Sequence, residues 1–420
     1  MRISGPDAVF VAKRLLVRKE FPEAGRMYLT SLLDADGKMI DRVLAVRFAA
    51  PKSYTGEDVV EVHTHGGSLI ARTCLELAVK NGARLAQPGE FTLRAFLNGR
   101  IDLAQAEGVL GVIQAKSSEA LHAAARTLSG ELSRKVQKIH DEILRLQGNL
   151  EIQLDFPEGE AFVGDLAEEL QSVRHELTEL ESRCRAGMLL NEGVRAVIAG
   201  RPNAGKSSLM NALLGRNRAI VTEIPGTTRD IIEEGIIIGG VPVKLMDTAG
   251  LREADDVIEA EGVRLARQAV SEGDVCLYVI DASCGLSDED EEYLAGLAGK
   301  KVIVVLNKSD LPCKVNNNNI PFPKIHVSAK NHTGLDDLRN MLYGICCDDS
   351  ALSEGLNVSV SQLEEIHSAR EAVSDALVSV SEDITAGLLG SARMCLLRVL
   401  GVDAGDELLD SMFSRFCVGK

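Results

Sequence analysis

Hydrophobic and polar positions follow three different rhythms along this chain of 420 residues. Residues 1 to about 95 contain the short alternating stretches MYLTSLL, DRVLAVRF and DVVEVHTH, and one helical stretch after Gly66-Gly67. Alternation of apolar and polar residues is typical of half-buried strands. This part of the chain therefore predicts an α+β domain.

The second rhythm is helical and covers residues from about 100 to 188. Apolar residues recur there at spacings of three and four, as in LAQAEGVLGVIQAKSSEALHAAARTL, and strong helix formers dominate the composition. Several helices packed as a bundle are the natural interpretation. The same pattern returns from about residue 358 and continues to the end of the chain.

The third rhythm lies between the two helical parts. Short apolar runs alternate there with helical stretches, and the runs are VRAVIAG, VPVKLMD, VCLYVID, KVIVVLN and IHVSA. This alternation is typical of a doubly wound, mostly parallel sheet. We therefore predict a multidomain α+β and α/β protein in which the α/β domain interrupts one helical domain. The predicted limits are 1–95 for the N-terminal domain, 96–190 and 349–420 for the two helical parts, and 191–348 for the α/β domain.

Composition narrows the classes of function. The formal net charge of −16 makes the chain a poor general binder of nucleic-acid backbone, so a contact with RNA should be local or left to a partner. Nine cysteines are scattered without a CxxC pair, which fits reduced thiols better than a disulfide framework. No apolar run is long enough to span a bilayer. We expect a cytoplasmic protein without a membrane partner.

The strongest motif is VIAGRPNAGKSS, which contains Gly200-x-x-x-x-Gly205-Lys206-Ser207 between a predicted strand and a predicted helix. This is the context that a phosphate-binding P-loop requires. Its backbone amides and the lysine attract phosphates, and the serine hydroxyl can ligate Mg²⁺. The residues that we predict to contact nucleotide here are Asn203, Ala204, Gly205, Lys206, Ser207 and Ser208.

Three further segments follow in the order expected of a GTPase. Asp247-Thr248-Ala249-Gly250 can serve Mg²⁺ and the terminal phosphate, and Asn307-Lys308-Ser309-Asp310 ends the strand KVIVVL. The carboxylate of Asp310 can accept from guanine N1–H and its 2-amino group, a donor pair that adenine lacks. Ser328, Ala329 and Lys330 can approach the base carbonyl. The intervening loop VTEIPGTTRD supplies Thr228 as a second predicted Mg²⁺ ligand, with Thr222, Glu223, Ile224, Pro225, Gly226 and Thr227 near the nucleotide.

One position departs from the small GTPases, in which the residue after this DTAG segment is a glutamine that orients the attacking water. Here it is Leu251, whose side chain can neither donate nor accept a hydrogen bond. Another group must therefore orient the water and offset the charge of the transition state.

The ordered motifs GRPNAGKSS, TEIPGTTRD, DTAGLRE, NKSD and SAK resemble the potassium-dependent branch of translation-factor-like GTPases. The resemblance implies that Asn203, the backbone carbonyls of Thr222 and Ile224, and Thr227 bind K⁺. A cation between the phosphates would neutralise developing charge as an arginine finger does.

The parts outside the GTPase motifs narrow the resemblance further. The chain ends in FCVGK and contains Tyr54-Thr55-Gly56-Glu57-Asp58 and Pro88-Gly89-Glu90-Phe91-Thr92. Together these look like the MnmE (TrmE) family of tRNA modification GTPases, over nearly the whole chain. The resemblance implies that Glu259 orients the water once two GTPase domains dimerise, with Glu253, Asp255, Asp256 and Glu261 as competitors. It also makes Cys417 functionally relevant, with its chemical role left open.

The resemblance further implies a folate-binding N-terminal domain that forms a homodimer. Its ligand would be 5-formyl- or 5,10-methylene-tetrahydrofolate, and the contacts carried over to this chain are Arg2, Glu61, Arg100 and Lys420. A carboxylate suits the amino-pyrimidine edge of the pterin, and basic residues suit the glutamate tail. The family has a further strand before the position of Arg2, so the N-terminal sheet is expected to lack one strand.

The predicted function is GTP hydrolysis in the modification of the wobble uridine of tRNA at C5, within a heterotetramer that includes the FAD-dependent partner MnmG (GidA). Two alternatives stay open. A ribosome-assembly GTPase of the same branch would be favoured by a basic RNA-binding domain after the GTPase. A folate-dependent aminomethyltransferase with a regulatory GTPase would be favoured by product formed without a flavin partner.

Overall fold

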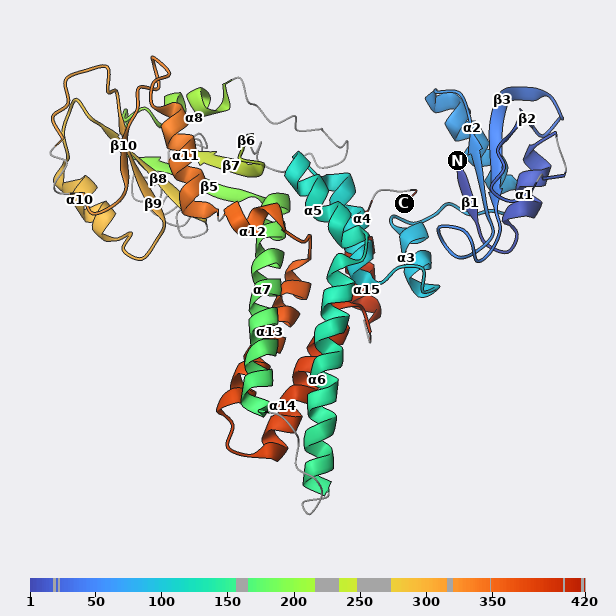
Figure 1. Cartoon of the computed structure of the whole chain (residues 1–420). Coiled ribbons are helices and arrows are strands. Elements are labelled where there is room, and N and C mark those ends of the chain that lie inside the picture. The colour runs from blue at the N-terminus through green and yellow to red at the C-terminus, as the bar shows by residue number, and fades with distance from the viewer. Residues whose placement is uncertain are drawn as a thin grey trace. The chain divides into compact units, whose positions relative to one another are not determined.

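The computed structural model of the chain describes residues 1–17, 20–21, 23–155, 165–215, 234–247, 273–315, 320–347, 349–402, 405–416 and 419 (Figure 1). These residues form two compact units, which are described separately below. The first unit spans 1–110, 128–173 and 368–420, and the second spans 111–127 and 174–367.

The first unit begins with an antiparallel sheet that has the strand order β1-β4-β3-β2 among the described residues. Its strands are β1 (Arg2–Ser4), β2 (Tyr28–Leu33), β3 (Met39–Phe48) and β4 (Val59–His63). Apolar residues on one face of the sheet are buried against α1 (Ala8–Leu15) and α2 (Ser68–Lys80). The α+β character predicted for this part is confirmed, and β1 lies opposite β4 with Arg2 beside Glu61.

The sequence pattern predicted a single helix in the first 95 residues, whereas the structure also has α1 and α3 (Glu90–Leu97). The core positions of α1 are Ala8, Val11, Ala12 and Leu15, which follow helical spacing. Each of these two helices has only eight residues, so the periodic signal covers little more than two turns. Such short signals are hard to separate from loops by sequence alone.

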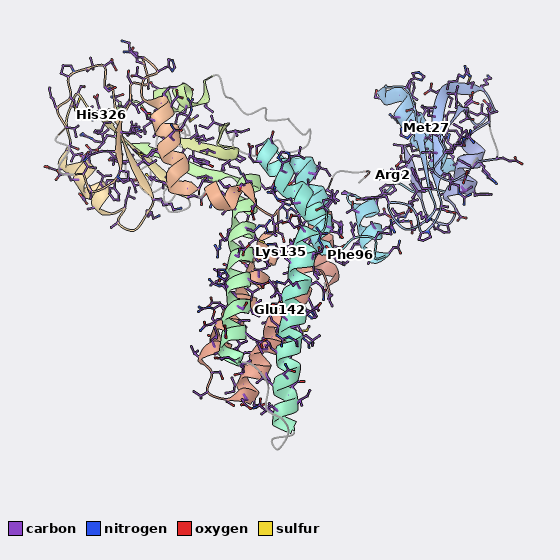
Figure 2. All side chains as sticks on the ribbon, viewed as in Figure 1. Arg2, Met27, Phe96, Lys135, Glu142 and His326 are labelled. Atoms are coloured by element: carbon purple, nitrogen blue, oxygen red, sulfur yellow. The ribbon has the colours of Figure 1, made fainter. Side chains whose placement is uncertain are left out.

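The helices in the two predicted helical parts of the chain are α4 (Leu103–Gln114), α5 (Ser118–Leu128), α6 (Glu131–Asp155), α7 (Leu166–Glu192), α13 (Val360–Val378), α14 (Glu382–Val399) and α15 (Asp406–Phe413). In the first unit α6 and α14 run side by side (Figure 1). Phe413 of the last helix, α15, and Phe416 just after it pack into an apolar cluster with Leu103 of α4 and Phe96 of α3, which Figure 2 labels.

The second unit contains a six-stranded sheet in the order β10-β9-β8-β5-β7-β6 within the described ranges. The strands are β5 (Val194–Gly200), β6 (Glu234–Ile238), β7 (Val241–Asp247), β8 (Val275–Asp281), β9 (Val302–Asn307) and β10 (Lys324–His326). All neighbours pair in parallel except β6, an unpredicted antiparallel edge strand. Apolar side chains of α8 (Lys206–Leu214) and α11 (Leu335–Cys346) cover one face and those of α10 (Asp288–Ala295) the other. The predicted doubly wound, mostly parallel sheet is confirmed.

The chain leaves the helices through α7 and returns after α12 (Asp349–Ser353), and these two connections lie side by side in the second unit. The amide of Leu356 donates to the carbonyl of Arg183 at 3.0 Å, and a guanidinium nitrogen of Arg126 donates to the carbonyl of Gly355 at 2.7 Å. An inserted domain needs such a paired exit and return. The four domain limits given above remain predictions. Among the described helices, none is both long and apolar enough to cross a membrane.

Candidate functional site

The P-loop joins the end of β5 to the start of α8. Gly205 has a φ of +94° directly before the helix, and a Cβ there would lie 2.3 Å from Nδ2 of Asn307. Both the left-handed backbone and the close approach require glycine. The buried Lys206 donates through Nζ to the carbonyls of Gly200 and Arg201, each at 2.9 Å. These bonds hold the ammonium at the end of β5, where the loop begins.

Asn307 connects the three predicted nucleotide segments that the structure describes. Its Nδ2 donates to the carbonyl of Ala204 at 2.9 Å, and its Oδ1 accepts from the amide of Ala329 at 3.1 Å. Asn307 is buried, so both bonds lie away from water. The P-loop, residues 307–310 and residues 328–330 thus meet at the carboxyl ends of β5, β9 and β10, where ligands of doubly wound sheets bind.

Lys308 forms a second connection to the P-loop. Its Nζ donates to the carbonyl of Asn203 at 3.0 Å and to Oδ2 of Asp281 at 2.6 Å. Burial opposes ionisation of Asp281, but hydrogen bonds from Lys308 and Ser283 outweigh it and lower the pKa of Asp281 to about 2. Sequence reasoning missed Asp281, although a carboxylate at the end of VCLYVID marks the same edge of the sheet.

Asp310 lies beside the loop that follows β10. The hydroxyl of Ser328 donates to its Oδ1 at 2.6 Å and lowers the pKa of that carboxyl. The carboxylate is therefore ionised near neutral pH and remains exposed to solvent. An exposed, ionised acceptor at this edge of the sheet has the chemistry needed for the two guanine donors.

Of the other predicted nucleotide residues, some lie within the described ranges and others lie outside them. Ser207 and Ser208 lie in the first turn of α8, Lys330 follows Ala329, and Asp247 ends β7 opposite Ile198 of β5. The side chain of Asp247 is outside the description. The predicted residues that lie outside the described ranges are Thr222, Glu223, Ile224, Pro225, Gly226, Thr227, Thr228, Thr248, Ala249, Gly250, Glu259, Cys417 and Lys420.

Two of the predicted folate residues bind one another in the first unit. Nε of Arg2 donates to Oε1 of Glu61 at 2.8 Å. Cζ of Arg2 also lies 5.4 Å from the ring centroids of both Tyr54 and Phe91, a distance at which a cation attracts an aromatic face. We call these four residues the Arg2 cradle. Neither ring was assigned a role from the sequence, because each is an isolated aromatic in a loop or a short helix.

The third predicted folate residue, Arg100, lies against the same loop as Tyr54. A Cβ at Gly56 would be 3.3 Å from Cγ of Arg100, and the amide nitrogen of the Asn98 side chain donates to the carbonyl of Thr55 at 2.7 Å. Residues 53–58 therefore contact Arg2 through Tyr54 and lie against Arg100 at Gly56.

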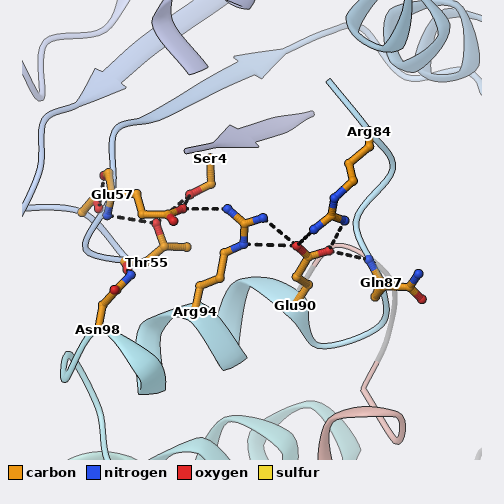
Figure 3. A network of polar contacts seen from close by, with 9 residues as sticks. Ser4, Thr55, Glu57, Arg84, Gln87, Glu90, Arg94 and Asn98 are labelled. Carbon is orange, nitrogen blue, oxygen red and sulfur yellow. Dashed lines mark hydrogen bonds and ion pairs between the residues drawn. The ribbon is translucent and has the colours of Figure 1, made fainter. Parts of the chain in front are cut away.

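A chain of alternating charges links Glu57, Arg94, Glu90 and Arg84 in the same unit (Figure 3). Arg94 donates through Nη1 to Oε2 of Glu57 at 2.9 Å, and through Nη2 to Oε1 of Glu90 at 2.7 Å. Glu90 also accepts two hydrogen bonds from Arg84 and one from the amide of Gln87. Glu57 and Glu90 both lie in motifs that carry the family resemblance, but nothing in the sequence indicates that Arg94 joins them.

The bonds around Glu90 predict a specific acid sensitivity. Hydrogen bonding from Arg84, opposed by burial and supported by Gln87 and Arg94, lowers the pKa of Glu90 from 4.5 to about 2. A lowered pKa in the folded state stabilises the fold above pH 4.5, and this contribution is lost as the pH falls towards 2. It amounts to at most about 3 kcal/mol at 1.4 kcal/mol per pH unit.

We therefore expect Glu90→Gln to have a lower urea midpoint than the unchanged chain at pH 7. The difference between the two midpoints should become smaller at pH 3. Glutamine keeps the shape of the side chain but cannot ionise. Urea unfolding at pH 7, 4.5 and 3 measures this, and the same difference at all three values would contradict the assignment.

Two family models match this chain. The model described as MnmE helical domain matches residues 103–417, and that described as GTP-binding protein TrmE N-terminus matches residues 1–100. The tRNA modification GTPase MnmE of Carboxydothermus hydrogenoformans is 40% identical to this chain over an alignment of 448 residues, gaps included. The alignment covers 100% of this chain and 96% of that protein. The MnmE of Symbiobacterium thermophilum is 43% identical over 438 residues, with the same coverage. Among solved structures, Aquifex aeolicus Era is 26% identical with a TM-score of 0.29, covering 46% of this chain and 69% of that one. By its family-model matches and its identity to these two relatives, the chain belongs to the MnmE family of tRNA modification GTPases.

Proposed function

We propose that this chain is a K⁺-dependent GTPase that acts in the modification of the wobble uridine of tRNA at C5, and that its hydrolysis requires dimerisation of two GTPase domains. The observation that carries the GTPase part is the meeting of the P-loop, residues 307–310 and residues 328–330 through Asn307. Family membership supports the tRNA part over a ribosome-assembly role, since the matches extend over both parts outside the GTPase motifs.

The proposed roles follow from the positions of the side chains. Lys206 and the amides at the start of α8 would hold the outer phosphates, and Asp310 would accept from the guanine edge. Ser207 and Thr228 would ligate Mg²⁺, with Asp247 acting through water. The bound Mg²⁺ would neutralise charge on the phosphates.

Asn203 is the proposed K⁺ ligand of the P-loop. It has a φ of +64°, its carbonyl accepts from Lys308, and the residue is exposed. Its side chain is therefore held on a fixed turn beside the phosphate position while remaining accessible to an ion. Thr222, Ile224 and Thr227 would complete the site, and Glu259 would orient the water that Leu251 cannot.

The Arg2 cradle fits a reduced folate in its chemistry, since it offers a carboxylate, a guanidinium and two aromatic faces. Arg2, Glu61, Arg100 and Lys420 are the proposed contacts, and 5-formyl- or 5,10-methylene-tetrahydrofolate the proposed ligand. Glu61 already binds Arg2, so a pterin would share this carboxylate with the guanidinium or displace it. The proposed partners are a second copy of this chain, an FAD-dependent MnmG (GidA) protein and tRNA, in the cytoplasm.

The test is the rate of GTP hydrolysis by the purified chain in KCl and in NaCl at equal ionic strength. We expect a strong increase with K⁺, because the cation would replace the charge of an arginine finger, which is worth about 10³–10⁵ in rate. Asn203→Ala should abolish the K⁺ response, and Glu259→Ala should abolish hydrolysis while nucleotide binding persists.

Asp336→Ala provides the control, because it removes an exposed carboxylate of α11 that is not a candidate for this role. It should hydrolyse GTP at the unchanged rate. Equal rates in the two salts, together with a Glu259→Ala variant that hydrolyses normally, would rule out this mechanism and point to an arginine supplied by a partner. A Glu259→Ala variant that hydrolyses normally but still needs K⁺ would move the role of orienting the water to Glu253, Asp255, Asp256 or Glu261.

A further inference from the structure

Arg94 joins two segments that are far apart in the sequence, although it does not contact Arg2 in any described interaction. Its guanidinium reaches Glu57 in the loop of residues 53–58 and, through two nitrogens, Glu90 at the start of its own helix, α3 (Figure 3). Glu57 is further held by the hydroxyl of Ser4 on β1, at 2.8 Å. Arg94 thus ties α3 to the loop and to the sheet.

The same two segments carry the aromatic rings of the Arg2 cradle. Tyr54 belongs to the loop and Phe91 to α3, and the hydroxyl of Tyr54 lies 3.0 Å from that of Thr92. The spacing between the loop and α3 therefore sets the spacing between the two rings. Asn98, at the end of α3, also donates to the carbonyl of Thr55 in the loop. Among the described residues, Arg94 and Glu57 form the only ion pair that joins the two segments.

The charges explain why this spacing depends on Arg94. The side chains of Glu57 and Glu90 are 26% and 10% exposed, and Arg94 lies between them at 28%. Without the guanidinium, two partly buried carboxylates would face each other across the gap between loop and helix. Like charges repel, and the two carboxylates would lose the guanidinium that they share. Glu90 would keep its bonds from Arg84, whereas Glu57 would keep only the hydroxyl of Ser4 as a side-chain donor among the described bonds, so part of the compensation for its burial would be lost.

We propose that Arg94 is a positioning residue of the folate site, which spaces Tyr54 and Phe91 around Arg2 through its bonds to Glu57 and Glu90 and thereby sets the affinity for a reduced folate. This inference rests on the folate binding proposed above. It concerns a residue that need not touch the ligand.

The experiment measures binding of 5-formyl-tetrahydrofolate to the full chain by calorimetry. We expect Arg94→Met to bind about 30-fold more weakly, which corresponds to about 2 kcal/mol. Arg72→Met is the matched control, because Arg72 also pairs with a glutamate four residues away on a helix of the same unit, but in solvent. It should bind within about twofold of the unchanged chain, since an exposed pair contributes little.

A second pair of variants separates positioning from general loss of fold. Arg94→Met combined with Glu57→Gln removes one of the two like charges, and we expect it to recover affinity to within about fivefold of the unchanged chain. Arg94→Lys keeps a cation that can reach one carboxylate, so its affinity for the folate should lie between those of the unchanged chain and Arg94→Met. It replaces Arg94→Met in the experiment if that variant does not fold. Thermal unfolding of each variant identifies those that are folded.

Four outcomes of these binding measurements would contradict the positioning role of Arg94. Unchanged affinity in Arg94→Met, or a double variant as weak as Arg94→Met alone, would overturn the positioning role. Equal losses in Arg72→Met would show a general sensitivity to charge and would overturn it too. If the unchanged chain does not bind the folate, the folate proposal itself fails, and this inference fails with it.

Discussion

Asp310→Asn should weaken GTP binding by at least about 100-fold, because a site built to bind specific hydrogen-bond donors discriminates strongly when its acceptor is changed. The carboxylate is positioned by the hydroxyl of Ser328 and is ionised, so it can accept from both guanine donors. An amide offers one acceptor and adds two N–H donors. One of those donors would meet the guanine edge without an acceptor, which costs binding energy.

The same variant should gain affinity for xanthosine triphosphate. Xanthine carries a carbonyl where guanine carries the 2-amino group, and this carbonyl can accept from the asparagine amide. Binding of fluorescent guanosine and xanthosine nucleotides measures both changes. Asp336→Asn is the control, because it makes the same replacement at an exposed carboxylate of α11. Guanosine affinity retained in Asp310→Asn would show that base selection lies elsewhere.

Gly187→Ala should destabilise the second unit by more than about 3 kcal/mol, although alanine is the better helix former by about 1 kcal/mol. Gly187 lies within α7, where the returning chain crosses it. A Cβ there would lie 2.0 Å from the carbonyl oxygen of Leu356 and 2.3 Å from its carbon. These are backbone atoms, and the amide of the same residue donates to the carbonyl of Arg183. Moving them away from the new Cβ would therefore cost this hydrogen bond.

Gly148→Ala makes the same change within α6, where a Cβ would meet nothing within 4 Å. It should leave stability unchanged or raise it by up to about 1 kcal/mol. Thermal and urea unfolding of both variants, compared with the unchanged chain, provide the measurement. Equal effects of the two substitutions would mean that the crossing at Gly187 is not a tight contact.

Local pattern was sufficient for five of the six described strands of the α/β part of the fold. The five apolar runs overlap β5, β7, β8, β9 and β10. The signal is clearest for β8 and β9, because a strand buried on both faces needs an unbroken apolar stretch. The edge strand β6 was missed, and so were the eight-residue helices α1 and α3. The two helices are too short for their periodicity to stand out from their surroundings.

The candidate nucleotide site was also readable from local sequence. Gly205, Lys206 and Ser207 act as neighbours in one loop, so their spacing alone indicates a phosphate site. The roles of Asn307 and Asp281 were less visible. Asn307 bonds to Ala204, 103 residues earlier, and Asp281 to Lys308, 27 residues later. Only the order of the strands in the sheet makes them neighbours.

By itself the sequence determined the segments that act locally: the P-loop, the buried strands, the helical periodicity and the motifs that carry the family resemblance. The tertiary structure alone decided which distant residues meet. It placed Arg94 between Glu57 and Glu90, set Tyr54 and Phe91 around Arg2, and brought Gly187 against Leu356. The physical reason is that hydrophobic periodicity reports which face of an element is buried, whereas partners across a fold depend on how separate elements pack, and no local pattern encodes that.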